Sequence, residues 1–423
     1  MNAQTVRPSG RGFLLFDSHP AGCARFVDDL ALQAGAPLPV DRDRADRDRA
    51  DRDRADRDRP VVLIIGASAG YGLAATVTGI VQHGVNGVAV SQERPGRGRR
   101  TATAGWYRTA RTAELAAEHG SDLTFVNADC FARATKDEVL DLVAERFGRV
   151  DHLVYSVAAP RRTDPATGVT HESVLKPIGS PYLSRALAFD EDAKPKLNES
   201  VIEPASDEEI AATVAVMGGE DWEAWVRALV ERGLTGDRFS TVALSYLGAE
   251  PTAAIYRKGS IGAAKEHLER TAHTLDALLR GTGGSAFVSV NGATFTQASA
   301  AIPGMALYLA LLHRSLAGGL QTPVEQLTRL WGHLTGTSPL PLDAEGRVRL
   351  DDWELLPDVQ AAVGEAWQRV RSEDVAEHAD TEWVWREFRQ LHGFDLDGVD
   401  YEEPVPIDVA WPAPDTADSV RVG

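Results

Sequence analysis

The stretch Val61-Val62-Leu63-Ile64-Ile65-Gly66-Ala67-Ser68-Ala69-Gly70-Tyr71-Gly72 decides how this chain folds. Its first five residues are all branched and apolar, which is typical of a strand buried on both faces of a parallel sheet. Gly66 permits an abrupt turn into a helix, and Gly70 and Gly72 let a ligand approach the backbone closely. The first helical turn offers unpaired N–H groups and a positive dipole end, which suit a diphosphate. The stretch therefore predicts a dinucleotide-binding turn, and a purely structural turn is the alternative.

Strand and helix patterns alternate after this turn. Because the strands are largely apolar and helices lie between them, the pattern predicts an α/β fold, a Rossmann-like doubly wound parallel sheet with helices on both faces. The expected strands are 61–65, 87–91, 123–126, 150–157, 241–246 and 286–290, and the expected helices are 72–82, 109–119, 136–147 and 261–279. Further helices are expected at 305–316, 323–334 and 359–371.

Composition shifts divide the chain into segments. Residues 1–40 are expected to pack on the core, and 41–59 form a low-complexity insertion that cycles through Asp, Arg and Ala. This insertion has no apolar face, so we expect a mobile surface loop, with a solvated helix as the alternative. Residues 60–300 are expected to form the NAD-binding catalytic domain, including a proline-interrupted excursion at 160–238 that covers the substrate over the sheet edge. Residues 301–423 are expected to form a helical C-terminal region.

The overall composition excludes several classes of protein. The 423 residues carry a formal net charge of −18, which argues against binding to nucleic acid or to an anionic membrane surface. Two cysteines cannot build a disulfide framework, and no apolar run is long enough for a membrane helix. No cluster of ligands indicates a metal site. We therefore expect a soluble cytoplasmic protein, and a monomer.

A dinucleotide bound at the glycine turn would extend along the carboxyl ends of the next strands. Glu93 follows the second strand, where a carboxylate binds the adenosine ribose and repels a 2′-phosphate. Arg94 has the opposite effect, and a solvated loop carboxylate is the alternative for Glu93. We expect NADH to be preferred over NADPH. Asp129-Cys130 follow the third strand near the adenine edge, and Val157-Ala158 close the fourth near the nicotinamide ribose.

One tyrosine–lysine pair has a spacing that can serve a reductase. None of the eight tyrosines has a lysine four or seven positions later, but Tyr256 has Lys265 nine positions later. Nine residues of one continuous helix turn through about 900°, which puts two side chains on opposite faces. They can converge only if Tyr256 lies before the helix, and Gly259 and Ser260, a suitable N-cap, favour a helix start there. The lysine would then hold the nicotinamide ribose and favour an ionised phenol nearby. A core tyrosine and a surface lysine are the alternative.

Many ordered sequence blocks carry a resemblance to a known family. They are Arg11-Gly12-Phe13, His19-Pro20, Gly22-Cys23, Gly66 to Gly72, Gly105-Trp106-Tyr107, Tyr155-Ser156, Ala159-Pro160-Arg161-Arg162, Lys176-Pro177-Ile178-Gly179, Met217 to Trp222, Tyr246-Leu247-Gly248, Thr296-Gln297-Ala298-Ser299 and Asp397 to Tyr401. With the Y-x8-K spacing of Tyr256 and Lys265, the chain resembles the V-type enoyl-acyl carrier protein reductases, also called trans-2-enoyl-CoA reductases. The likeness covers nearly the whole chain apart from the Asp/Arg insertion.

The resemblance implies NADH-dependent reduction of trans-2-enoyl thioesters of CoA or acyl carrier protein, the last reductive step of fatty acid elongation. It implies Tyr256 as proton donor, Lys265 as the lysine that contacts the cofactor, and Tyr246 as a substrate contact. The implied cofactor contacts are Gly66, Ala67, Ser68, Ala69, Gly70, Tyr71, Gln92, Glu93, Asp129, Cys130, Val157, Ala158, Lys265, Ala293, Thr294 and Phe295. Flavin is not expected, because the chain has no second dinucleotide loop.

Two departures from the family pattern lie near the expected site. Arg257-Lys258 stand where many carrier-protein members have Trp and then Asn or Asp, and Asn291-Gly292 replace a usual Leu-Lys. These changes bear on acyl-length preference and rate more than on reaction type. Two other functions remain as alternatives: a short-chain dehydrogenase that reduces a carbonyl, which the missing Y-x3-K opposes, and a noncatalytic NADH-binding sensor, which the Tyr256/Lys265 pair opposes.

Overall fold

The centre of the molecule is a seven-stranded sheet in which every neighbouring pair is parallel. The computed structural model describes residues 3–35, 59–190, 194–300, 302–316 and 318–412. In sheet order the strands are β12 (Arg347–Leu350), β11 (Ser285–Asn291), β10 (Thr235–Ser245), β5 (Val150–Tyr155), β2 (Val61–Ile65), β3 (Asn86–Ser91) and β4 (Leu123–Asn127). The predicted doubly wound parallel sheet is confirmed.

The strand order reverses between β2 and β5. From β2 the chain proceeds through β3 to β4 on one side, and from β5 through β10 and β11 to β12 on the other. Ligands of such sheets bind at the carboxyl ends of the strands that flank this switch point. Gly66 follows β2 and Ser156 follows β5, so the glycine turn lies at the switch point.

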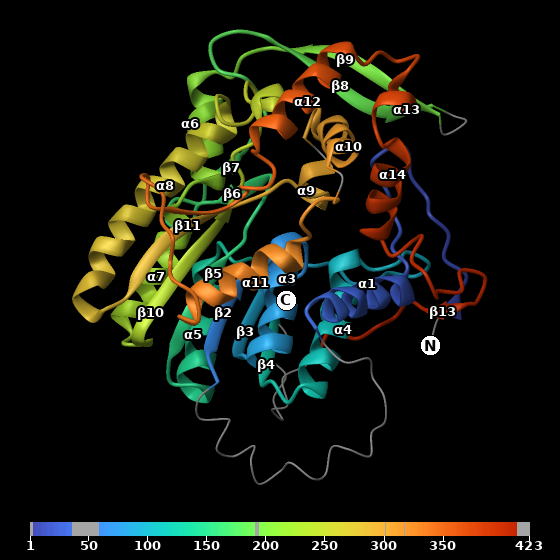
Figure 1. The fold of residues 1–423 in the computed structure, drawn as a ribbon. Coiled ribbons are helices and arrows are strands. Elements are labelled where there is room, and N and C mark those ends of the chain that lie inside the picture. The colour runs from blue at the N-terminus through green and yellow to red at the C-terminus, as the bar shows by residue number, and fades with distance from the viewer. Residues whose placement is uncertain (1–2, 36–58, 191–193, 301, 317, 413–423) are drawn as a thin grey trace.

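Helices cover both faces of the sheet (Figure 1). One face packs against α1 (Pro20–Gln33), α3 (Gly70–Thr78), α4 (Ala104–Glu118) and α11 (Pro323–Leu334), with a short π-helical turn (Gly79–His83) after α3. The other packs against α5 (Arg133–Arg146), α7 (Glu220–Glu231) and α8 (Ser260–Leu279). Both interfaces are continuous apolar cores, because the strands present aliphatic side chains to both sides.

A third apolar core joins the C-terminal helices to the end of the sheet that holds the glycine turn. Tyr256, Ala293 and Phe295 pack there with α10 (Met305–Ser315), α12 (Pro357–Arg369) and their neighbours. In Figure 1 these helices and the hairpin of β8 and β9 gather above the sheet. The other elements here are β8 (Tyr182–Phe189), β9 (Pro195–Ile202), α9 (Gln297–Ala300), α13 (Val375–His378) and α14 (Thr381–Gln390).

The excursion after β5 is partly different from the prediction. It contains the hairpin β6 (Arg161–Thr163) and β7 (Thr170–Glu172), the hairpin β8–β9 and α6 (Asp207–Met217), which lie off the sheet as expected. Helix α7, however, packs on β5 and β10 as an ordinary crossover helix, because Trp222, Trp225 and Leu229 form an apolar face. Strand β10 also begins at Thr235, six positions before the predicted start at Thr241.

Several remaining features complete the fold. The Asp/Arg insertion at 41–59 lies, apart from Arg59, outside the described residues, as does the end of the C-terminal tail. Strand β1 (Ala3–Gln4) pairs with β13 (Val405–Pro406), so the two ends of the described chain meet. In the part of the chain that the structure describes, no helix is long and apolar enough to cross a membrane, and no group of three His, Cys, Asp or Glu side chains could hold a metal ion.

Candidate functional site

The glycine turn after β2 is shaped by contacts that exclude a side chain. Gly66 has φ +90°, and a Cβ there would overlap the carbonyl oxygen of Ser156 at the end of β5. A Cβ at Gly72 would overlap the carbonyl oxygen of Gly66, so the helix approaches the strand closely. The N-cap residue Ala69 gives α3 no side-chain cap. The first N–H groups of α3 are therefore available for an anion.

The side chain of Tyr71 binds other parts of the protein and does not face a ligand. Its hydroxyl donates to the Gly292 carbonyl oxygen at 2.5 Å and lies 3.3 Å from Gln326 Oε1. Gln326 Oε1 also accepts from the Gly292 N–H at 2.8 Å. Tyr71 thus ties the glycine turn to the residues that follow β11, and only its backbone remains for a diphosphate.

Glu93 is held against the glycine turn. Its Oε1 accepts from the Ser68 hydroxyl at 2.6 Å, and its Oε2 accepts from the Thr103 hydroxyl. Gly105 packs directly against this carboxylate, where a Cβ would overlap it. Glu93 is only partly exposed, whereas Gln92 and Arg94 are exposed. The carboxylate therefore faces the turn in a fixed orientation, unlike a freely solvated loop residue.

A buried ion pair supports the loop after β4. Lys136 Nζ donates to the Cys130 carbonyl oxygen at 2.7 Å and to Asp221 Oδ1 at 2.6 Å, and it lies 5.0 Å from the Trp225 ring centroid. The Tyr155 hydroxyl donates to the other oxygen of Asp221 at 3.1 Å. Asp129 and Cys130, both partly exposed, are thereby fixed at the end of β4. Sequence reasoning missed Lys136 and Asp221.

Tyr256 lies in the turn before α8, as the nine-residue spacing requires. Lys265 lies on the second turn of α8, and both side chains are 8% exposed. Neither the Tyr256 hydroxyl nor the Lys265 ammonium has a hydrogen-bond partner among the described residues. Burial lowers the pKa of Lys265 to about 8 and raises the pKa of Tyr256 above its ordinary value.

Two expectations about this pair need correction. The N-cap of α8 is Gly259, and the hydroxyl of Ser260 instead donates to the Val174 carbonyl oxygen at 2.5 Å. Lys265 does not lower the pKa of Tyr256, which burial and then the charge of Glu354 both raise. The phenol is therefore protonated at neutral pH, as a proton donor must be.

Arg257, one of the two departures from the family pattern, fastens the tyrosine turn to α8. Its Nη1 and Nη2 donate to the two Glu269 oxygens at 3.0 and 3.2 Å. Glu269 is one helical turn beyond Lys265, on the same face of α8. The ion pair therefore joins the segment that carries Tyr256 to the segment that carries Lys265. Lys258 is exposed and lies 3.6 Å from Glu250.

Glu354 connects three parts of the site and was missed from the sequence. It follows β12, and its Oε1 accepts from the Tyr246 hydroxyl at 2.9 Å and the Tyr308 hydroxyl at 2.6 Å. Its Oε2 accepts from the Ala293 N–H at 2.5 Å. The Tyr246 ring packs edge-on against Tyr256, with 5.0 Å between ring centroids. Tyr246, Tyr256 and Ala293 are thus brought together around one carboxylate.

The other predicted residues differ in exposure. Val157 packs on the core under α7 and α8, and Ala158 is exposed at the end of β5. Thr294 is partly exposed, while the Phe295 ring is buried against Phe13, with centroids 5.7 Å apart. Only the backbone of Phe295 is therefore near the strand end.

Gly292, part of the second departure from the family pattern, has a packing reason. A Cβ at this position would meet the Trp353 ring at 2.5 Å, so the indole leaves room only for glycine. Trp353 is the residue before Glu354. Gly292 therefore packs against the segment that carries the buried Glu354 carboxylate.

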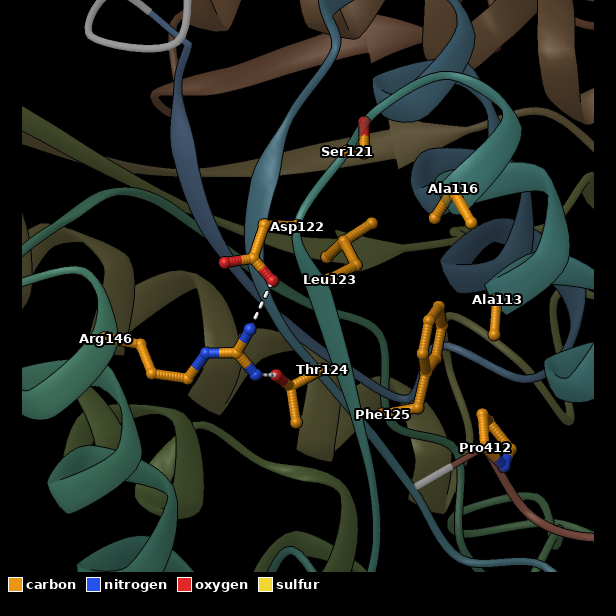
Figure 2. A pocket seen from close by; sticks show the side chains of 10 residues that line it. Ala113, Ala116, Ser121, Asp122, Leu123, Thr124, Phe125, Arg146 and Pro412 are labelled. Carbon is orange, nitrogen blue, oxygen red and sulfur yellow. Dashed lines mark hydrogen bonds and ion pairs between the residues drawn. The ribbon is translucent and has the colours of Figure 1, made fainter. Parts of the chain in front are cut away.

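A separate hollow of about 160 Å³ lies over the edge strand β4 (Figure 2). Figure 2 shows Arg146 directed at Asp122 and Thr124, and the Arg146 guanidinium donates to both side chains. Ala113, Phe125 and Pro412 line its other side. Its charged groups already neutralise each other, and none of the predicted site residues lines it.

Comparison with known proteins gives a consistent picture. A family model described as the trans-2-enoyl-CoA reductase catalytic region matches residues 100–334, and one for the NAD(P)H binding domain of trans-2-enoyl-CoA reductase matches residues 5–98. A third, described as an enoyl reductase FAD binding domain, matches residues 342–405.

Individual relatives agree along the whole chain. An enoyl-[acyl-carrier-protein] reductase [NADH] of Streptomyces avermitilis is 51% identical over 96% of this chain and 100% of its own. A trans-2-enoyl-CoA reductase [NADH] of Clostridium perfringens is 39% identical over 95% of this chain and 99% of its own. The crystal structure of Treponema denticola trans-2-enoyl-CoA reductase in complex with NAD superimposes with a TM-score of 0.83 at 37% identity, covering 94% of this chain and 97% of that one.

Proposed function

This chain belongs to the trans-2-enoyl-CoA reductase family and is an NADH-dependent enoyl thioester reductase, and we propose that Tyr256 and Lys265 carry its chemistry. The observation that supports this assignment is the pair of free polar groups beside the glycine-turn end of the sheet. Tyr256 and Lys265 are each 8% exposed, and neither the hydroxyl nor the ammonium has a hydrogen-bond partner among the described residues. Buried polar groups are normally satisfied, so these two are suited to bind ligands.

The residues around the switch point fit NADH. The uncapped N-terminus of α3 and the close approach at Gly66 and Gly72 suit the diphosphate. Glu93 would hold the adenosine ribose, and Lys265, whose ammonium makes no salt bridge among the described residues, would hold the nicotinamide ribose. When bound, NADH supplies the hydride that is added to the β-carbon of the enoyl thioester.

The segment that matches the FAD-named model does not fit a flavin dinucleotide. Its strand β12 leads into Asp351-Asp352-Trp353-Glu354 instead of a glycine turn, and carboxylates repel a diphosphate. This segment instead supplies Glu354 to the reductase site.

The side chains of the site support reduction of a carbon–carbon double bond. As the β-carbon is reduced, negative charge develops on the thioester oxygen. The free and protonated Tyr256 hydroxyl would donate a hydrogen bond to this oxygen, and a proton taken up from solvent by the α-carbon would complete the reaction. The third core, with Phe295 and α10, would exclude water from the reacting atoms.

The reaction is tested by following NADH absorbance with purified protein. We expect NADH oxidation with crotonyl-CoA, with longer trans-2-enoyl-CoA esters or with an enoyl-acyl carrier protein, and much slower oxidation with β-ketoacyl thioesters. The ranking of kcat/KM across this series also identifies the carrier and the acyl length. Faster reduction of β-ketoacyl thioesters would instead identify a carbonyl reductase, and no oxidation with any thioester would indicate a noncatalytic protein.

Glu93 is expected to select NADH over NADPH. Replacement by serine removes a charged acceptor for the ribose hydroxyls, and such hydrogen bonds contribute about 1.5–3 kcal/mol. We therefore expect Glu93→Ser to lower kcat/KM for NADH by about tenfold or more and to raise the NADPH:NADH ratio of kcat/KM. Glu138→Ser, on the exposed face of α5, is the control. An unchanged ratio in Glu93→Ser would remove Glu93 from cofactor selection.

We further propose that the protein acts as a cytoplasmic monomer in the last reductive step of fatty acid elongation. Two observations support this. Both cysteines are free, which suits a reducing compartment, and one chain contains the glycine turn, both tyrosines, Lys265 and Glu354. Size-exclusion chromatography with light scattering measures the oligomeric state, and a stable dimer would contradict the proposal.

A further inference from the structure

The two site tyrosines differ in what their hydroxyls bind. The Tyr246 hydroxyl donates to Glu354 Oε1 at 2.9 Å, while the Tyr256 hydroxyl has no partner among the described residues. Their rings are in contact, with 5.0 Å between centroids and 73° between planes. A phenol has a single proton to donate. The Tyr246 phenol therefore already uses its proton in a hydrogen bond to Glu354, whereas the Tyr256 phenol can still donate its proton to a ligand.

The carboxylate that accepts the Tyr246 hydrogen bond cannot easily lose this donor. Glu354 is 0% exposed and accepts from Tyr246 and Tyr308 on one oxygen and from the Ala293 N–H on the other. No Lys, Arg or His side chain of the described residues pairs with it. Losing one of the donors would leave a buried carboxylate less solvated, which costs more than a neutral hydrogen bond contributes.

We propose that Glu354 is a positioning residue that assigns the roles of the two tyrosines. By accepting the hydrogen bond of the Tyr246 hydroxyl, it prevents Tyr246 from donating to the thioester oxygen and leaves Tyr256 as the donor. The same carboxylate fixes the Ala293 N–H, so it also aligns the backbone after β11 with the tyrosine pair. This inference rests on the proposed reaction and goes beyond it, because either phenol alone could chemically serve that oxygen.

The ionisation of Glu354 sets the pH range in which it can have this role. The titratable groups that face it are Tyr71, Tyr246, Tyr256, Tyr308 and Asp351. All are acids, and burial raises the pKa of Glu354 to about 7. Slightly above this pH Glu354 is ionised and can only accept hydrogen bonds. The activity of the variants is therefore measured at a pH slightly above 7, where Glu354 is ionised.

A double-mutant cycle of Glu354→Gln and Tyr256→Phe tests the assignment. In Glu354→Gln the amide oxygen is needed by the Ala293 N–H, so the NH2 group faces the two hydroxyls and donates to them. Tyr246 must then turn its proton elsewhere and can donate to the thioester. The measurement is kcat with saturating crotonyl-CoA and saturating NADH. Tyr308→Phe, which removes the other donor on the same carboxylate oxygen, is the matched control.

Non-additive losses are expected. Tyr256→Phe should lower kcat by about 10²–10³-fold in the native background but by about tenfold or less in the Glu354→Gln background. In the Tyr308→Phe background the loss should remain as large as in the native one, because Glu354 still binds Tyr246. Equal losses in the native and Glu354→Gln backgrounds would overturn the proposal.

Tyr246→Phe gives a second test that does not depend on whether the Glu354 variant folds. The ring and its contact with Tyr256 are kept, and the hydroxyl that is lost is one that we infer to be bound to Glu354 and unavailable to substrate. The expected fall in kcat is about tenfold at most. A loss as large as that of Tyr256→Phe would overturn the proposal even if Glu354→Gln were unfolded by circular dichroism.

The outcomes separate this inference from the proposed reaction. If native protein oxidises no NADH with any enoyl thioester, the proposed reaction is wrong and so is the role of Glu354. If native protein is active and Tyr256→Phe is not, but the cycle is additive, the reaction stands and only the assignment by Glu354 is wrong.

Discussion

Replacing Tyr256 with phenylalanine is expected to lower kcat by about 10²–10³-fold with every enoyl thioester that the native protein reduces. The change removes one oxygen atom from a buried ring that packs against Tyr246 and the third core. Since the Tyr256 hydroxyl has no partner among the described residues, its loss leaves no buried group unsatisfied. The fold should therefore be unchanged, and the loss should come from the missing donor at the thioester oxygen.

Binding measurements distinguish this loss from damage to the cofactor site. Titration of NADH fluorescence should give a Kd for Tyr256→Phe within about threefold of the native value, because the predicted cofactor contacts lie elsewhere. Tyr401→Phe is the control for loss of a phenolic hydroxyl that is not among the predicted site residues; this hydroxyl donates to the Gly393 carbonyl oxygen and accepts from the Leu396 N–H. Near-native turnover in Tyr256→Phe would show that Tyr256 is not the donor.

The central strands could be predicted because the sequence marks them by burial on both faces. Strand β2 has no polar residue, and all five of its side chains are buried. Strand β12 could not be predicted in this way, because Arg347 and Arg349 alternate with Val348 and Leu350. Each arginine is neutralised locally: Arg347 donates to Asp343 and Arg349 to Asp351, at 2.9 and 2.8 Å. Arg347 also lies 3.4 Å from Glu269 of α8, and no local pattern specifies that tertiary contact.

Site residues that belong to a local sequence pattern could be predicted, and those that depend on tertiary structure could not. The glycine turn and the Tyr256/Lys265 spacing are local patterns, and the fold brings both to the carboxyl ends of the strands. Glu354 depends on β12: once that strand is known to be parallel to β11, an acid just beyond its end is expected at the same sheet edge. Without β12, Glu354 is one of many acids in an acidic chain. The helical spacing of Trp222, Trp225 and Leu229, by contrast, was a usable signal for α7.

Lys265 is expected to destabilise the folded protein and to be necessary for cofactor binding. Burial lowers the pKa of Lys265 in the folded protein from the ordinary lysine value of 10.5 to about 8. Because the folded state disfavours the proton, the ammonium destabilises the fold by about 3 kcal/mol at neutral pH. This penalty is fully present below the folded pKa and fades as the pH rises toward the unfolded value. Lys265→Met should therefore raise Tm at neutral pH and lose this advantage above about pH 10.

The same substitution should weaken NADH binding by about tenfold or more, because a buried ammonium donating to the ribose contributes more than a neutral hydrogen bond. In the native protein, kcat/KM should fall as the pH rises through about 8, where Lys265 in the free enzyme loses its proton. Lys265→Arg, which keeps its charge, should shift this alkaline limb upward. A less stable Lys265→Met variant that binds NADH normally would contradict both assignments, since the ammonium would then be serving the fold instead of the cofactor.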